Sequence, residues 1–151
     1  MSARVQIVLQ GPMDHLRLVW QTGECLLQMV PFRGDSEGTR HSVLLAVQEM
    51  VTNVLRHAHG GDEELPITVS FQVDEYGCEI AIEDLGVEFD PSRAPLPQLS
   101  DGAMPTEPGG FGILIARMVM DQVEHRRVGQ RNVLCMRKSV RSAVEAEAKG
   151  G

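Results

Sequence analysis

The sequence lacks the features that mark nucleic-acid-binding, disulfide-bonded and membrane-spanning proteins. No basic patch with interleaved aromatic residues occurs, and the formal net charge of -7 is spread over the chain, so we expect no nucleic-acid partner. No stretch approaches the roughly 18 apolar residues that span a bilayer, and the N-terminus has no sustained apolar segment. Cysteines are few, odd in number and form no CxxC pair, which argues against a disulfide framework and a zinc ribbon. We therefore expect a cytoplasmic protein that does not associate with membranes, with three reduced, packed thiols at Cys25, Cys78 and Cys135.

A Walker A motif, GxxxxGK followed by Ser or Thr, is also absent, as is any internal repeat of about 20 to 50 residues. The chain has 151 residues, of which 42% are hydrophobic, which is enough for one globular domain with a real core. From Ser139 to Gly151 the sequence becomes polar and rich in Ala and Glu. We interpret this end as a polar C-terminal tail.

Hydrophobic periodicity predicts an α+β protein. The expected elements are, in order, a strand over 5–9, a helix over 13–30, a helix capped by Ser36 or Thr39 and ending at Gly60 and Gly61, a hairpin over 67–73 and 78–82, a helix over 113–123 and one or two strands over 125–138. Helices and strands occur in clusters and not as repeated βαβ units. We expect a two-layer sandwich, in which helices cover one face of a mixed, mainly antiparallel sheet.

Three polar residues, Glu49, Asn53 and His57, recur every four positions in the second predicted helix. At about 100° per residue they form one stripe along the border of the apolar face. Two interpretations are open. Either the stripe lines the rim of a cleft, or Glu49 and Asn53 are half-exposed surface residues and His57 complements the helix C-terminal dipole.

Two glycine-containing motifs follow. Asp84 ends an alternating strand and is followed by Gly86, which permits a sharp turn or a close approach to the backbone. Gly110 and Gly112 precede an apolar helix, where they form either an anion site of unpaired N–H groups or a simple hinge and cap. Between the motifs, residues 87–109 carry several prolines and little apolar periodicity, which favours a functional lid.

In this order, the three motifs resemble the GHKL ATPase superfamily. Glu49, Asn53 and His57 match its N box, Asp84 and Gly86 its G1 box, and Gly110 and Gly112 its G2 box. The wording of EMVTNVLRHAH, of Asp84 to Pro91 and of GGFGILIARMVMDQVEH looks most like bacterial anti-sigma-factor serine kinases. The resemblance implies a Bergerat ATP-binding fold over residues 1–138, with 139–151 as the tail. It also implies a kinase, often dimeric, that binds a sigma factor and phosphorylates a serine of an anti-sigma antagonist.

The resemblance assigns a role to each motif residue. Asn53 would be a ligand of the Mg²⁺ that bridges the ATP phosphates, and Glu49 the general base for the serine hydroxyl. Asp84 would accept a hydrogen bond from the adenine amine, and Gly86 would give the base room. Gly110 and Gly112 would present backbone amides to the phosphates, and a cation such as Arg93 would assist.

Some positions depart from the family pattern. Phe111 and Ile113 stand where leucine is commoner, and Asn132 stands where a threonine or serine is frequent, which puts one phosphate or base contact in doubt.

An ATP-binding regulatory module that acts by occupancy, without turnover, is the alternative function. A sensor histidine kinase fragment is a weaker one, since no helix carrying a phosphoacceptor histidine is recognised. Apolar residues Leu16, Trp20 and Leu27 in the first helix suggest a homodimer face.

Overall fold

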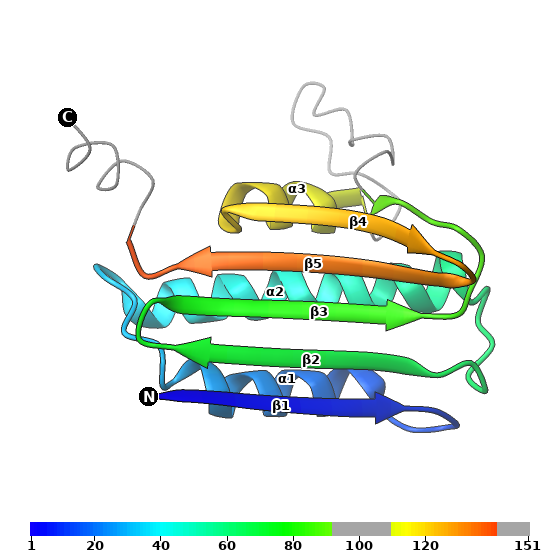
Figure 1. Ribbon diagram of the computed structural model, residues 1–151, viewed down its shortest axis with the longest axis horizontal. Coiled ribbons are helices and arrows are strands. Elements are labelled where there is room, and N and C mark those ends of the chain that lie inside the picture. Colours follow the sequence, from blue (N-terminus) through cyan, green and yellow to red (C-terminus); the bar gives the residue numbers. More distant parts are fainter. Residues whose placement is uncertain (92–109, 142–151) are drawn as a thin grey trace.

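A five-stranded sheet and a layer of helices make up the protein. The structure, a computed structural model, describes residues 1–91 and 110–141. The strands are β1 (Ser2–Leu9), β2 (Ile67–Asp74), β3 (Gly77–Asp84), β4 (Gln122–Val128) and β5 (Arg131–Ser139), in the sheet order β1-β2-β3-β5-β4 (Figure 1). Every pairing within the described ranges is antiparallel, so the sheet is wholly antiparallel and not mixed.

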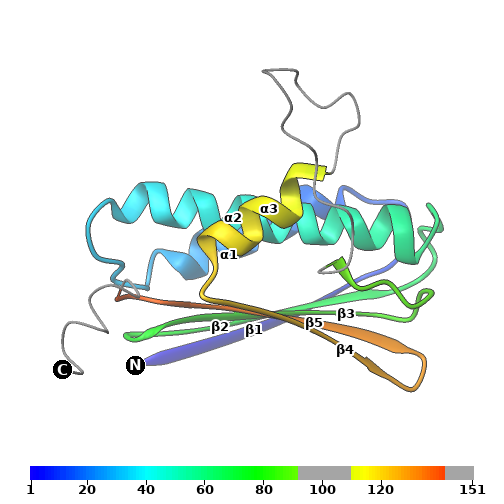
Figure 2. The same ribbon diagram turned by 90° about the horizontal axis from the view of Figure 1, so that it is seen from above.

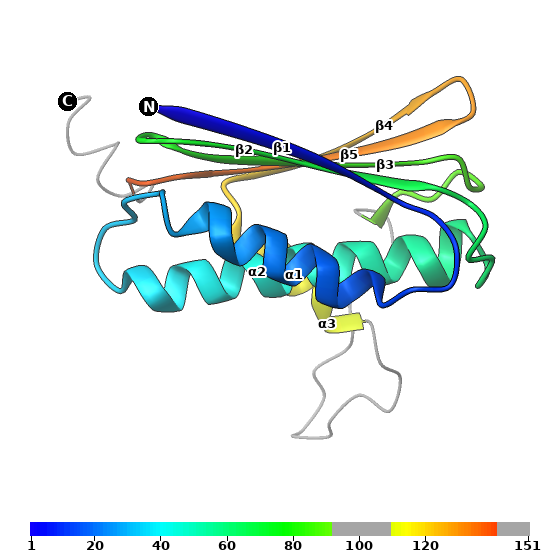
Figure 3. The ribbon, with the colours of Figure 1, turned by 90° about the horizontal axis from the view of Figure 1, so that it is seen from below.

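Helices α1 (His15–Leu27), α2 (Ser36–Asn53) and α3 (Gly110–Val119) all lie on one face of the sheet (Figure 2). Seen from below, α1 and α2 run side by side along the sheet (Figure 3). The core lies between the layers and is formed by alternate strand residues and the inner helix faces, including the fully buried Phe71, Met50, Ile80 and Met136. The predicted two-layer α+β architecture is confirmed.

The hairpin prediction is also confirmed, because β2 and β3 pair in full register from Ile67 with Asp84 to Asp74 with Gly77. The prediction that Ser36 or Thr39 caps the N-terminus of the second helix was wrong. Asp35 caps α2, with its Oδ1 accepting from the backbone N–H of Gly38 at 2.9 Å. A carboxylate at this position satisfies an otherwise unpaired helix N–H and complements the positive end of the dipole.

The second helix does not continue regularly to Gly60. After Asn53 the chain forms a π-helical segment, η1 (Val54–Ala58), in which the hydrogen bonds reach one residue further than in an α-helix. The side chains beyond Asn53 are therefore rotated relative to the α-helical stripe that the sequence predicts. Such π-segments inside helices are frequent at functional sites.

Two expectations about apolar and sulfur side chains need correction. Leu27 is fully buried in the core and contributes nothing to an exposed face, whereas Leu16 and Trp20 are half-buried. The three thiols are free, but only Cys78 is buried. Cys25 lies exposed on α1, and Cys135 is half-buried. Within the described ranges, no helix has the length and apolarity needed to cross a membrane.

Candidate functional site

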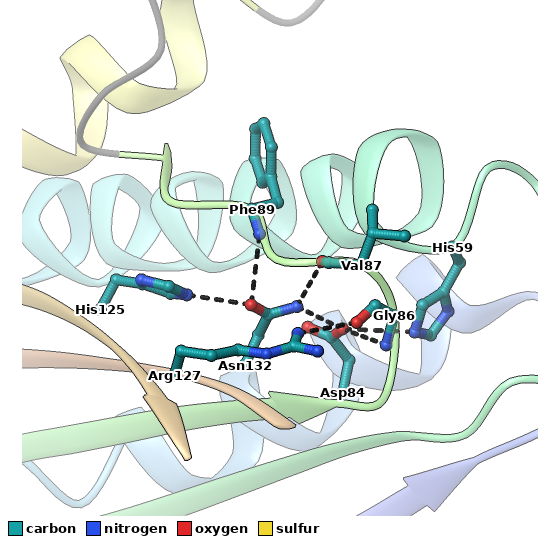
Figure 4. A network of polar contacts seen from close by, with 8 residues as sticks. All are labelled: His59, Asp84, Gly86, Val87, Phe89, His125, Arg127 and Asn132. Atoms are coloured by element: carbon teal, nitrogen blue, oxygen red, sulfur yellow. Dashed lines mark hydrogen bonds and ion pairs between the residues drawn. The ribbon is translucent and has the colours of Figure 1, made fainter. Parts of the chain in front are cut away.

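The candidate site lies at the end of the sheet where β3 finishes and β5 begins, beside η1 (Figure 2). Asp84 is the last residue of β3 and pairs across the sheet with Asn132. Asp84 is 3% exposed, and its Oδ1 accepts from the Gly86 N–H at 2.8 Å and from the Asn132 Nδ2 at 3.0 Å (Figure 4). Neither bond involves Oδ2. A buried carboxylate held in this way is a fixed acceptor.

Gly86 is required by packing within the protein itself. A Cβ at this position would lie 2.3 Å from the carbonyl oxygen of Ala58, and the next residue, Val87, donates its N–H to that oxygen at 3.0 Å. The close approach that the sequence predicts at Gly86 is therefore made by the end of η1. Any larger residue would force the loop after β3 away from the helix.

Asn132 ties this loop to the sheet. Its Nδ2 donates to Asp84 Oδ1 and to the Val87 carbonyl at 2.8 Å, and its Oδ1 accepts from the Phe89 N–H at 3.2 Å. His125 Nε2, on β4, lies 3.1 Å from the same Oδ1 (Figure 4). The sequence departs from the family pattern at Asn132, and the structure places this residue at the centre of a polar network.

The stripe on α2 divides at the start of η1. Asn53 is 2% exposed, which contradicts the interpretation of Asn53 as a surface residue, and its Nδ2 has no hydrogen-bond partner among the described residues. Glu49 is half-buried. His57 is exposed and stacks on the Phe89 ring, with centroids 4.7 Å apart and planes at 18°. It also stands in the last turn of η1, so the dipole interpretation remains open alongside the stacking.

Gly112 of the third motif contacts this stripe. Gly110 is the first residue of α3, and a Cβ on Gly112 would lie 2.6 Å from Oε2 of Glu49. The first turn of α3 therefore packs directly against the Glu49 side chain. Because the first N–H groups of a helix have no partner within it, this contact brings anion-binding donors beside a carboxylate. Arg93 and most of the predicted lid lie outside the described residues.

Sequence analysis did not single out His59, which is part of the site. It is 6% exposed, its Nε2 lies 3.6 Å from Asp84 Oδ1, and neither ring nitrogen has a hydrogen-bond partner in the described structure. Burial lowers the pKa of His59, although the nearby Asp84 carboxylate acts in the opposite direction. The ring is thus kept neutral beside the buried carboxylate. His59 lies off the four-residue stripe, so the spacing of polar residues gave no signal for it.

A metal ion held by protein side chains alone does not fit the described residues. Among them, no group of three or more His, Cys, Asp or Glu side chains could hold a metal. The amide oxygen of the buried Asn53 does fit Mg²⁺ bound mainly through phosphates, because this ion prefers oxygen ligands and usually takes few from the protein, whereas the unpartnered Nδ2 is a donor and cannot bind the metal.

Comparisons with known proteins identify the family of the chain. A family profile described as "Histidine kinase-like ATPase domain" matches residues 14–138. The chain is 34% identical over 97 residues to the serine-protein kinase RsbW of Oceanobacillus iheyensis, and the match covers 60% of each chain. It is 30% identical over 84 residues to RsbW of Listeria innocua, covering 53% of this chain and 54% of that protein. The chain thus spans little more than half the length of these relatives.

A solved structure containing RsbU and RsbW domains from Mycobacterium tuberculosis superposes with a TM-score of 0.59. The superposition covers 89% of this chain and 32% of that one, at 13% identity. At this identity the likeness concerns the fold alone.

Proposed function

This chain belongs to the family of histidine kinase-like ATPase domains, and from that premise we propose that it is an ATP-dependent serine-protein kinase. The proposal extends to an anti-sigma factor that phosphorylates a serine of an anti-sigma antagonist. The names of the relatives support the kinase activity. The partners are inferred from the resemblance of the three motifs.

One observation carries the proposal: the carboxylate of Glu49 packs against Gly112 at the start of α3, and one helical turn further lies the buried amide of Asn53. A base, a neutral oxygen ligand and a helix N-terminus are the groups that phosphoryl transfer needs. The Asn53 Nδ2 group is buried without a hydrogen-bond partner among the described residues, which supports a ligand-contacting role for this side chain.

Each residue then has a chemical task. Glu49 accepts the proton of the serine hydroxyl as the serine oxygen bonds to the γ-phosphorus and the bond to ADP breaks. Asn53 holds the metal, and the amides of Gly110 and Gly112 bind the phosphates. Mg²⁺, when bound, neutralises the charge of the phosphates. Asp84 accepts a hydrogen bond from the adenine amine.

The exposed part of α1 is the proposed homodimer face. With Leu27 in the core, this face is reduced to the half-buried Leu16 and Trp20, which lie one helical turn apart. Sedimentation at tens of micromolar would test it, and a monomer would contradict it.

The kinase proposal is tested by incubating the chain with labelled ATP, Mg²⁺ and a candidate antagonist protein. Transfer of label to a serine supports the kinase. ATP binding with no transfer to any antagonist supports the alternative, a regulatory module that acts by occupancy. No ATP binding contradicts both.

A further inference from the structure

Asn132 uses all of its hydrogen-bonding capacity within the protein. The two Nδ2 hydrogens face acceptors, the Asp84 carboxylate and the Val87 carbonyl. Oδ1 receives the Phe89 N–H and lies 3.1 Å from His125 Nε2. An amide has two donor hydrogens and two acceptor lone pairs, so this side chain has nothing left to offer a ligand.

The surrounding groups also fix the orientation of the amide. Nδ2 cannot exchange places with Oδ1, because an oxygen would then face a carboxylate and a carbonyl. Since Oδ1 is an acceptor, His125 must carry a hydrogen on Nε2 to bond to it. The network therefore runs in one direction, from His125 on β4 through Asn132 on β5 to Asp84 on β3.

Two consequences concern the carboxylate and its loop. Oδ1 of Asp84 is occupied by two donors, from Gly86 and Asn132, whereas neither of these bonds uses Oδ2. The loop from Val87 to Phe89 is bonded at both ends to the same Asn132 amide. The orientation of the base-contacting carboxylate and the course of the loop beside it therefore depend on one side chain.

We propose that Asn132 is a positioning residue that determines base selectivity, by holding Asp84 so that Oδ2 is presented to an exocyclic amino group. The inference rests on the proposed function and assigns the recognition of adenine over guanine to this network. Adenine carries an amine at the ring position where guanine carries a carbonyl oxygen. A fixed carboxylate oxygen accepts a hydrogen bond from the adenine amine and repels the guanine carbonyl oxygen.

The test uses Asn132→Leu, which keeps the size of the side chain and removes its hydrogen bonds. Calorimetry would measure binding of Mg-ATP, Mg-GTP and Mg-tripolyphosphate, which has no base. We expect ATP affinity to fall about 10- to 100-fold, the usual worth of one or two buried hydrogen bonds. The preference for ATP over GTP should be largely lost, and the affinity for tripolyphosphate should stay within about 3-fold of the parent value. Gln72→Leu, on the exposed face of β2, is the matched control and should change none of these.

Several results would overturn the inference. A folded Asn132→Leu variant with the parent ATP-to-GTP ratio would do so, and so would an equal loss of affinity for all three ligands, which indicates a purely structural role. If Asn132→Leu fails to fold, Asn132→Ser retains one hydroxyl and should show the same loss of selectivity in weaker form. A parent chain that binds no ATP would contradict the proposed function instead. If the parent chain binds ATP and the folded Asn132→Leu variant keeps the parent preference for ATP over GTP, only the role of Asn132 is contradicted.

A second variant tests the direction of the network. His125→Phe removes the ring nitrogen that bonds to Asn132 Oδ1 but leaves the bonds to Asp84 and Val87 in place. We expect a smaller fall in the ATP-to-GTP preference than for Asn132→Leu. A larger fall would contradict the assignment of Asn132 as the central residue.

Discussion

The side chain of Glu49 fills the space in which a side chain on Gly112 would stand. A Cβ on Gly112 would lie 2.4 Å from the Cβ of Glu49, far inside normal contact distance. Residues 63 positions apart thus fix how closely α3 approaches α2. The contact also orients the carboxylate toward the first turn of α3, where the helix dipole favours negative charge.

Gly112→Ala should therefore lower the rate of phosphotransfer per folded molecule, beyond any loss that reduced stability explains. The added methyl group must push α3 away from Glu49 and displace the proposed base from the phosphate-binding amides. Gly23→Ala is the control, because its Cβ would lie 2.7 Å from Leu44 Cδ2, a similar clash in a helix outside the proposed site. Both variants should lose thermal stability, but only Gly112→Ala should lose phosphotransfer per folded molecule. Equal activity in the two would contradict the role of the Glu49 contact.

Asp84→Asn should weaken ATP binding by roughly 1 to 3 kcal/mol, because an acceptor is replaced by a group that can present a donor to the adenine amine. Glu83→Gln is the matched control. Glu83 precedes Asp84 on β3, and its surface ion pair with Arg131, at 3.6 Å, contributes little. Calorimetry with Mg-ATP would measure both. Unchanged affinity in folded Asp84→Asn would refute the adenine assignment.

His59 should make stability depend on pH. Because burial lowers its pKa, the folded protein binds fewer protons than the unfolded chain between that lowered value and about 6.5. The free energy of unfolding should therefore decrease as the pH falls below about 6.5, by at most about 1.4 kcal/mol per pH unit for one proton. His59→Gln should show a shallower decrease in urea titrations from pH 7.5 to 5.5. Parallel curves for the two proteins would contradict the buried neutral state.

One cysteine should react rapidly with a thiol reagent at pH 8. Cys25 is exposed, whereas burial raises the pKa of Cys78 to about 12 and also raises the pKa of the half-buried Cys135. A single fast equivalent is expected, and Cys25→Ser should abolish it while Cys135→Ser should not. Two fast equivalents in the native protein would argue against the packing around β3 and β5.

Local patterns predicted much of the fold because they report directly on burial. Strict alternation in β2 and β3, with turn residues between them, was sufficient for the hairpin. Apolar spacing located α2, since its buried face contains residues such as Val43, Val47 and Met50. The motif residues Glu49 and Asp84 were singled out by the four-residue spacing of polar groups on α2 and by a strand end followed by Gly86, and their functional roles stay predictions.

Other features depend on contacts between distant parts of the chain and have no local signal. Asn132 bonds to Asp84 across 48 positions, and only the strand order of the sheet brings the two together. The end of η1 packs against the loop at Gly86, a contact that the sequence around η1 does not reveal. His59 becomes a buried partner of Asp84 through the same packing.

The comparison of Glu49→Ala with Asn53→Ala tests the kinase proposal most directly, because the two residues lie one turn apart on α2 and have different proposed roles. Mg-ATP affinity and phosphotransfer to the antagonist are measured for both variants and the parent chain. We predict that Glu49→Ala keeps nearly the parent affinity while phosphotransfer falls about 10²- to 10⁴-fold, the usual worth of a positioned general base. Asn53→Ala should lose Mg²⁺-dependent nucleotide binding. Phosphotransfer by Glu49→Ala at the parent rate would contradict the proposed mechanism.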